Sequence, residues 1–170
     1  MNYIIAQSMG IIAFVISLVA YHRDTKEKIL GNMVLSSVLN LIHYFMLGAF
    51  SGCITKVVAI LRDSFVIIKN KNKFLSSNLF LLIFFAIYLM VGILTYTSIW
   101  SVFPIIAAVI YIIPIWNGNE ITIKKTAFLC YFLWLIYNVC VFSIAGIISN
   151  IVSIISTFIA VKNANNSSGK

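Results

Sequence analysis

Seven long apolar segments follow one another along the chain, separated by short polar connections. A hydrocarbon core about 30 Å thick is crossed by roughly 17 to 25 helical residues, and each segment has about this length. The pattern predicts membrane-spanning helices over residues 3–21, 29–48, 51–68, 79–96, 98–115, 125–142 and 144–161. We therefore expect an all-α integral membrane protein with seven transmembrane helices.

The charges of the connections predict the orientation of the protein in the membrane. The connections 22–28, 69–78 and 117–125 are polar and basic, whereas the other three are short turns without charge. If the N-terminus is outside, ten Lys and Arg residues lie on the inner side and none on the outer side. Because these residues gather on the cytoplasmic side of membrane proteins, we expect an external N-terminus and a cytoplasmic C-terminus.

The composition narrows the possible functions. Hydrophobic residues make up 62% of the chain and charged residues 9%, and the net charge is +8. The orientation accounts for this positive charge, so nucleic acid is excluded as a partner. The three cysteines lie in apolar segments without metal-ligand spacing, and we expect no metal and no cofactor. With four acidic residues and no catalytic motif, the chain is not expected to be an enzyme.

The apolar pattern repeats after 94 residues. This shift places IIAFVI (11–16) on IIAAVI (105–110) and SGCITKVVAI (51–60) on AGIISNIVSI (145–154), and both uncharged turns coincide. The segment 79–96 is left over, carries no charged, amide or histidine side chain, and is the span we least expect to line a site. The expected domains are a first three-helix bundle (1–68), an inner loop and linker helix (69–97), a second three-helix bundle (98–161) and a polar cytoplasmic tail (162–170).

Two bundles of this kind resemble the SWEET and PQ-loop (MtN3-like) transporter superfamily, in which a linker helix joins two parallel three-helix bundles. HYFMLGAFSG (43–52) and the following Arg62 segment resemble more narrowly the YgjV-type bacterial inner membrane protein family. The resemblance implies a SWEET-like 3+1+3 fold in the bacterial inner membrane. It also implies an asparagine on the third helix of each bundle that holds the solute. Asn150 occupies that place in the second bundle, and Lys56 in the first. Only Pro104 and Pro114 are available for the hinge role of SWEET-type prolines.

Polar residues occur at corresponding places in the two bundles and predict a cavity between them. The candidate cavity or substrate-binding residues are Asn40, His43, Lys56, Trp134, Tyr137, Asn138 and Asn150. We expect His43 and Lys56 to face each other in the outer half, and Asn40 and Asn150 to close the cavity near the membrane middle. Arg62 and Asp63 are expected to form an inner gate or a structural ion pair.

Each candidate also has a purely structural interpretation. The lysine and arginine can extend toward the membrane surfaces, the histidine and aromatic residues can pack between helices, and the asparagines can join helices by hydrogen bonds. The matching positions in both bundles favour the functional interpretation.

The predicted function is that of a small secondary transporter or facilitator of a polar metabolite. A net charge of about +1 from Lys56, Arg62 and Asp63 favours an anionic solute. The alternative is a non-transporting membrane protein that binds a partner or lipid through its basic cytoplasmic face. The expected partners are the lipid bilayer and a small polar solute, and a homo-oligomer is left open.

Overall fold

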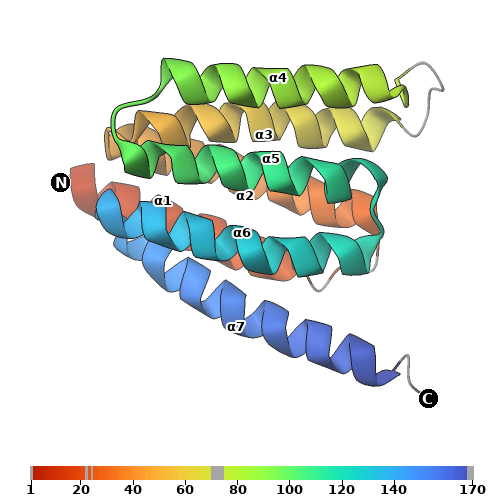
Figure 1. The fold of residues 1–170 in the computed structure, drawn as a ribbon. Helices are drawn as coiled ribbons and strands as arrows, with labels where there is room; N and C mark the ends of the chain where they lie inside the picture. Colours follow the sequence, from red (N-terminus) through yellow and green to blue (C-terminus); the bar gives the residue numbers. More distant parts are fainter. Residues whose placement is uncertain (1, 22, 24, 70–74, 168–170) are drawn as a thin grey trace.

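A computed structural model describes residues 2–21, 23, 25–69 and 75–167, and all the regular structure in these ranges is helical (Figure 1). The elements are α1 (Asn2–Tyr21), α2 (Lys26–Met46), α3 (Phe50–Lys69), α4 (Asn78–Leu94), the 3-10 helix η1 (Ile99–Ser101), α5 (Val102–Asn117), α6 (Glu120–Cys140) and α7 (Ile144–Ser167). Part of the predicted basic connection, residues 70–74, and the last tail residues, 168–170, lie outside the described residues.

Six of the helices form a ring. α2 packs between α1 and α3, α6 packs between α5 and α7, and contacts of α1 with α7 and of α3 with α5 join the two sets. α4 lies outside the ring against α3 and α5 (Figure 1). We call the end with the α2–α3 and α6–α7 turns (47–49 and 141–143) the turn end. The opposite end, with the α1–α2, α3–α4 and α5–α6 connections, is the loop end.

The outside of the ring is apolar. Large hydrophobic side chains are exposed on the helices, among them Ile4, Leu61, Leu82, Ile93, Ile113 and Phe158. By length and composition, three helical stretches can cross a membrane, namely Tyr3–Ala20, Lys26–Met46 and Ile99–Asn117, and two shorter apolar helices are Asn78–Leu94 and Ile144–Ile159. An exterior of this kind is suited to lipid, because hydrocarbon offers no partners to polar groups.

Helix bounds and turns correspond across the 94-residue shift. α2 and α6 have the same length, and both of their ends differ by 94 positions. Both helices begin with a side-chain cap at equivalent residues, because Thr25 accepts from the Lys28 amide and Asn119 accepts from the Thr122 amide. The turns that follow are equally alike. Ala49 N–H donates to the Tyr44 carbonyl and Ser143 N–H to the Asn138 carbonyl, each over 2.9 Å.

The same turns share an unusual backbone conformation. Gly48 has φ of 68° and Phe142, 94 positions later, has φ of 52°. A left-handed residue of this kind ends a helix by satisfying its last carbonyls, and glycine adopts it at least cost. Phe142 keeps the same turn although this conformation is less favourable for a residue with a side chain.

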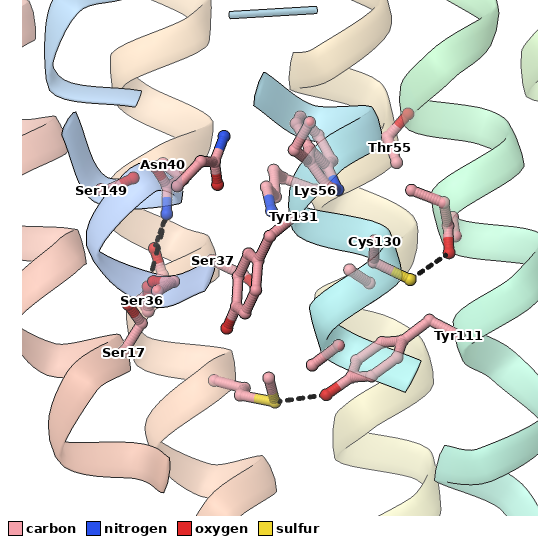
Figure 2. Close-up of a pocket in the computed structure, with 18 of the residues that line it drawn as sticks. Ser17, Ser36, Ser37, Asn40, Thr55, Lys56, Tyr111, Cys130, Tyr131 and Ser149 are labelled. Atoms are coloured by element: carbon pink, nitrogen blue, oxygen red, sulfur yellow. Dashed lines mark hydrogen bonds between the residues drawn. The ribbon is translucent and has the colours of Figure 1, made fainter. Parts of the chain in front are cut away.

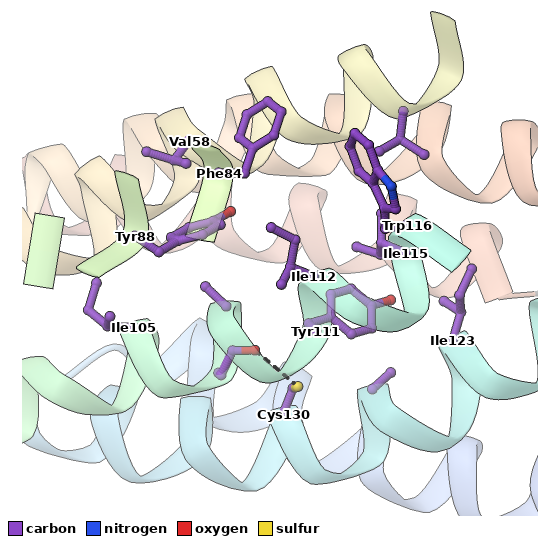
Figure 3. Close-up of a cluster of buried hydrophobic side chains, with 14 of the residues drawn as sticks. Val58, Phe84, Tyr88, Ile105, Tyr111, Ile112, Ile115, Trp116, Ile123 and Cys130 are labelled. Carbon is purple, nitrogen blue, oxygen red and sulfur yellow. Dashed lines mark hydrogen bonds between the residues drawn. The ribbon is translucent and has the colours of Figure 1, made fainter. Parts of the chain in front are cut away.

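Small residues set the spacing of α1 against its neighbours. Ala6, Ala13 and Ala20 recur every seven residues and are fully buried, and the Ser36 hydroxyl on α2 donates to the Ala13 carbonyl over 2.8 Å. A cluster of buried apolar and aromatic side chains joins α3, α4, α5 and α6 (Figure 3). It includes Val58, Phe84, Tyr88, Ile112 and Trp116. This cluster fixes α4 to the ring.

Two bounds differ from the sequence prediction. The predicted tail begins at residue 162, but α7 continues as a helix to Ser167. The predicted span 98–115 consists of a 3-10 turn followed by α5. Pro104 lies in the first turn of α5, where an N–H is not needed for the helix, and Pro114 lies inside its last turn. Both prolines are buried, and their hinge role stays a prediction.

Candidate functional site

A cavity of about 140 Å³ lies inside the ring (Figure 2). All six ring helices contribute lining residues, and Tyr88 reaches it from α4. A single water needs roughly 15 Å³, and a cavity of about 150 Å³ can hold a molecule of the size of benzene. The cavity therefore has room for a small organic solute.

Most of the residues that line the cavity are related in pairs by the 94-residue shift. Of the twenty-four lining residues, twenty form ten pairs that are separated by 94 positions. Examples are Ser36 with Cys130, Asn40 with Trp134, Tyr44 with Asn138, Thr55 with Ser149 and Lys56 with Asn150. The four unpaired residues are Arg62, Asp63, Tyr88 and Ala107. Equivalent residues thus surround one cavity, and three of the four departures from this symmetry are an ion pair and the tyrosine beside it.

Hydrogen bonds between the two halves of the ring close the turn end of the cavity. Tyr44 donates its hydroxyl to Asn138 Oδ1 over 2.9 Å, and both side chains are buried. Tyr137 accepts the backbone N–H of Gly52 over 2.9 Å. Tyr44 also stacks on Trp134, with ring centroids 5.6 Å apart. These contacts form a polar and aromatic wall between the cavity and the turns.

A second set of hydrogen bonds at this end is related by the same shift. Ser51 donates its hydroxyl to the Ser101 carbonyl over 2.8 Å. At the equivalent positions, the Ala145 N–H donates to Gln7 Oε1, also over 2.8 Å. The two bonds join α3 to the start of α5 and α7 to α1, so each junction of the ring carries one of them.

The structure corrects the predicted position of His43. Its Nδ1 lies 2.7 Å from the Ala6 carbonyl oxygen and its Nε2 lies 2.7 Å from the Ser143 hydroxyl. Because a carbonyl only accepts, Nδ1 carries the proton and Nε2 accepts from the serine. His43 is fully buried behind the cavity wall and does not face Lys56. The expectation that these two residues face each other was wrong, because Ala6 on α1 and Ser143 in the α6–α7 turn occupy both ring nitrogens.

Lys56 lines the cavity above an aromatic ring. Its Nζ lies 4.1 Å from the ring centroid of Trp134, and in the described part of the chain no carboxylate forms an ion pair with it. Its 94-residue equivalent, Asn150, lines the same cavity, and Asn150 Nδ2 is buried without an acceptor among the described residues. One cation and one amide donor are therefore available to a solute.

An ion pair lines another part of the cavity. Arg62 Nε donates to Asp63 Oδ1 over 2.7 Å, and both side chains are nearly fully buried. The guanidinium carbon of Arg62 lies 5.7 Å from the ring centroids of Tyr88 and Tyr111, a cation–π distance. Tyr88 comes from α4 (Figure 3). This helix is the span that we least expected to line a site, and one of its tyrosines lines the cavity beside the ion pair.

Some of the remaining predicted residues line the cavity and others lie outside it. Asn40 and Asn138 line the cavity, and Asn40 Nδ2 donates to the Ser36 carbonyl on its own helix over 3.1 Å. Tyr137, Pro104 and Pro114 lie outside the lining. The candidate set did not include the lining residue Tyr44. It also lacked Ser36, Thr55, Tyr111, Cys130 and Ser149, which line the cavity as well (Figure 2). The 94-residue shift would have added Tyr44, the equivalent of Asn138, but it does not lead from the predicted candidates to the others.

At the loop end, two lysines cap α5. Lys69 Nζ donates to the Trp116 carbonyl over 2.7 Å and lies 3.9 Å from the centroid of its ring. Lys26 Nζ donates to the Trp116 and Gly118 carbonyls. Lys69 lies just outside the predicted span 51–68, and burial together with the charge of Lys26 lowers the pKa of Lys69 to about 8. Cations at a helix C-terminus stabilise its unpaired carbonyls.

No metal site is evident in the part of the chain that the structure describes, where no three His, Cys, Asp or Glu side chains are grouped to hold an ion. The model of a bacterial inner membrane protein family, Imp-YgjV, matches residues 4–167. No curated protein and no solved structure matches the chain.

Proposed function

The chain belongs to the Imp-YgjV family of bacterial inner membrane proteins, and on this premise we propose that it is a secondary transporter or facilitator of a small polar solute. In this proposal all seven helices span the membrane, with two parallel three-helix units (α1–α3 and α5–α7) joined by α4. The turn end faces outward and the loop end faces the cytoplasm. The protein is not an enzyme in this account, and the solute passes through the cavity between the units.

The main support for the proposal is that equivalent residues of the two units line the cavity in pairs. Ten pairs of lining residues are related by the 94-residue shift, and Tyr44 and Asn138 contact each other across the line that relates the halves. Parallel repeats around an axis along the membrane normal are a known way to build a transporter, with the substrate site at the interface between repeats. Apolar packing alone would not require polar residues at equivalent depths.

The contacts at the turn end suggest how such a site opens. Hydrogen bonds of Tyr44, Tyr137 and Ser51 cross between the two units. A solute leaves toward the turns only when these bonds separate, so they act as the outer gate of the proposed cycle. Rocking of one unit against the other, with α3–α5 and α1–α7 as the moving contacts, is the motion that this arrangement favours.

The hydrogen-bonding groups and the charge of the cavity wall favour one class of solute. Hydrogen-bonding groups in the wall include Asn40, Asn150 and Thr55, and Lys56, Arg62 and Asp63 add a net charge of about +1. Buried groups of this kind are costly in a membrane unless they are paired or used. A solute that brings hydrogen-bond acceptors and one negative charge would satisfy them.

One observation favours the second candidate function, binding of a partner or of anionic lipid at the cytoplasmic face. Arg23, Lys28 and Lys125 are exposed at the loop end. Clusters of basic residues next to a membrane attract anionic headgroups, at about 1 kcal/mol for each residue. A protein with only this function would have no need of the cavity.

Uptake by proteoliposomes tests the proposal. Purified protein is reconstituted and loaded vesicles are assayed for exchange of labelled sugars, amino acids, amines and carboxylates, with protein-free vesicles as the control. Transport predicts saturable uptake of at least one small polar solute. If no solute in the panel is taken up while a partner protein copurifies and depends on Arg23, Lys28 and Lys125, the second function replaces the first.

Reporter fusions test the proposed topology separately. Reporters placed in the α1–α2, α3–α4 and α5–α6 connections and at the C-terminus should give cytoplasmic signals, and one at the N-terminus an external signal. A cytoplasmic N-terminus together with a cytoplasmic C-terminus would mean an even number of spans and would contradict the arrangement of two three-helix units and a linker.

A further inference from the structure

The serines that line the cavity all come from one side of the ring. They lie on α1, α2 and α7, which are neighbours, and are Ser17, Ser36, Ser37, Ser149 and Ser153. Figure 2 shows Ser17, Ser36 and Ser149 on one side of the cavity and Tyr111 and Cys130 on the other. The 94-residue equivalents of the five serines are Tyr111, Cys130, Tyr131, Thr55 and Ala59. We call the five residues the serine wall, a feature that the pairing of the lining does not require.

Two hydroxyls of the serine wall have no partner in the described part of the chain. Ser17, Ser36 and Ser149 donate to backbone carbonyls, as serines in helices commonly do. Ser37 and Ser153 are buried, yet no described residue forms a hydrogen bond with either side chain. Because a buried hydroxyl without a partner is unfavourable, these two hydroxyls are available to a bound solute.

Lys56 and Asn150 form a second pair of groups that a solute can satisfy. Within the described residues, Lys56 Nζ has Trp134 as its aromatic neighbour and no carboxylate partner. The buried Asn150 Nδ2 has no acceptor there. A carboxylate combines a negative charge with several acceptor positions, so one carboxylate can accept from both donors.

The two pairs lie at neighbouring depths in the cavity. Lys56 and Asn150 are the seventh residues after the turns 47–49 and 141–143. Ser37 is the tenth residue before the first of these turns, and Ser153 is the tenth residue after the second. Three residues correspond to about 4.5 Å along a helix. A hydroxyl on a carbon close to the carboxylate would therefore reach the serines while the carboxylate stays at the lysine.

The charge of the lining favours a monoanion. Among the described lining residues, Lys56, Arg62 and Asp63 are charged. Arg62 is paired with Asp63 over 2.7 Å, so the charge of Arg62 is balanced and that of Lys56 is not. One carboxylate neutralises Lys56, whereas a second negative charge on the solute would find no unpaired cation in the lining.

We propose that the cavity binds a small hydroxycarboxylate with one negative charge. Its carboxylate lies between Lys56 and Asn150, and its hydroxyl forms hydrogen bonds with Ser37 and Ser153. This inference rests on the proposed transport function and specifies its substrate class. The two pairs of residues divide the recognition, since the first pair requires the charge of the solute and the second pair requires its hydroxyl.

Calorimetric titration of the purified protein at neutral pH tests the proposal without depending on transport. Lactate is the probe, because it is a hydroxycarboxylate small enough for a cavity of about 140 Å³. Lactamide keeps the hydroxyl and lacks the charge, whereas propionate keeps the charge and lacks the hydroxyl. We expect lactamide to bind at least about tenfold more weakly than lactate, the loss of a charged hydrogen bond. Propionate should bind about two- to tenfold more weakly, the loss of a neutral one.

Variants of the serine wall assign the hydroxyl. The double variant Ser37→Ala with Ser153→Ala should bind lactate only as tightly as propionate, and its affinity for propionate should stay at the wild-type value. Ser17→Ala is the matched control, because the Ser17 hydroxyl lines the cavity but donates to the Phe14 carbonyl. This control should keep the wild-type preference for lactate. An equal loss of lactate and propionate binding in the double variant would indicate altered packing and contradict the role of the two hydroxyls.

A lysine variant assigns the carboxylate. Lys56→Met should weaken lactate and propionate binding alike, by at least about tenfold, and should leave the ratio between them unchanged. Lys125→Met removes an exposed lysine at the loop end and should bind both as the wild type does. Wild-type affinity for lactate in the Lys56→Met protein would overturn the assignment.

The outcomes separate this inference from the proposed function. If lactate does not bind, or if lactamide or propionate binds as tightly as lactate, the hydroxycarboxylate is wrong. The transport function then still stands where vesicles take up another small polar solute. If lactate binds with the expected preferences but vesicles take up no solute, the binding site stands and the transport function fails.

Discussion

The hydroxyl of Tyr44 donates a 2.9 Å hydrogen bond to the side-chain oxygen of Asn138, a residue 94 positions further along the chain. These two residues are equivalents in the two halves of the sequence, so the bond crosses the line that relates the halves. Equivalent residues can contact each other only where that line passes between them. The cavity, whose lining is paired in the same way, lies on this line.

The Tyr44–Asn138 bond should stabilise the contact between the two halves. Tyr44→Phe leaves a buried acceptor without its donor, and we expect a loss of about 1–3 kcal/mol. For a chain of this length, this corresponds to a fall in Tm of about 2–4 °C per kcal/mol. The measurement is thermal unfolding of the purified protein in detergent. Tyr3→Phe, which removes an exposed hydroxyl that donates to the Phe142 carbonyl, is the matched control and should change Tm little.

A double-mutant cycle isolates the bond itself. Asn138→Leu and Tyr44→Phe together should cost less than the sum of the single changes, by about 1 kcal/mol, since each single change leaves one unpaired group. Strictly additive costs would show that the two side chains contribute independently and that the bond does not hold the halves together.

A second prediction concerns the close approach at the start of α7. A Cβ on Gly146 would overlap the Asn138 side chain, whereas a Cβ on Gly31 would meet nothing within 4 Å. Gly146→Ala should therefore destabilise the protein by about 1–3 kcal/mol through overpacking. Gly31→Ala should be neutral or stabilising, because alanine is favoured by up to about 1 kcal/mol inside a helix. Equal Tm values for the two variants would contradict the packing described at the turn end.

The third prediction is a dependence of stability on pH at the loop end. Burial lowers the pKa of Lys69 to about 8 from its ordinary value of 10.5. Below pH 8 the folded protein bears the full cost of the buried charge. Between pH 8 and 10.5 it loses the proton before the unfolded chain does, so stability should rise with pH. We expect a rise of about 1 kcal/mol after allowance for screening by solvent.

Lys69→Met provides the comparison for this prediction. The difference in Tm between wild type and variant, measured at pH 7, 8, 9 and 10, removes the contribution of other groups that titrate in this range. The difference should grow in favour of the wild type as the pH rises. A difference that is constant over this range would mean that Lys69 does not change its protonation on unfolding.

Much of the fold follows from local signals in the sequence. Apolar segments of membrane length, uncharged turns and capping residues such as Thr25 and Asn119 act within a few positions, so they can be recognised without the structure. The shift of 94 residues was also visible, because both turns and both basic loops repeat with it.

The site was predicted less completely because it depends on which neighbour each polar group meets. His43 shares a helical stripe with Asn40, but α1 and the α6–α7 turn offer it two hydrogen-bond partners behind the wall. Tyr88 lies in a helix apolar enough to face lipid, and only the packing of α4 on α3 directs it to Arg62. Such partners lie 25 to 100 positions away in the sequence, and helical periodicity carries no information about them.

The most direct test of the proposed transport site is the effect of Lys56→Met on solute uptake by proteoliposomes. The substitution keeps the length of the side chain and removes its charge, and Lys125→Met controls for the loss of a lysine outside the cavity. We predict saturable uptake of a small anionic solute by wild-type protein and by Lys125→Met. Lys56→Met should raise the concentration for half-maximal uptake at least about tenfold, the loss expected for a charged hydrogen bond. Wild-type uptake kinetics in the Lys56→Met protein would contradict the account.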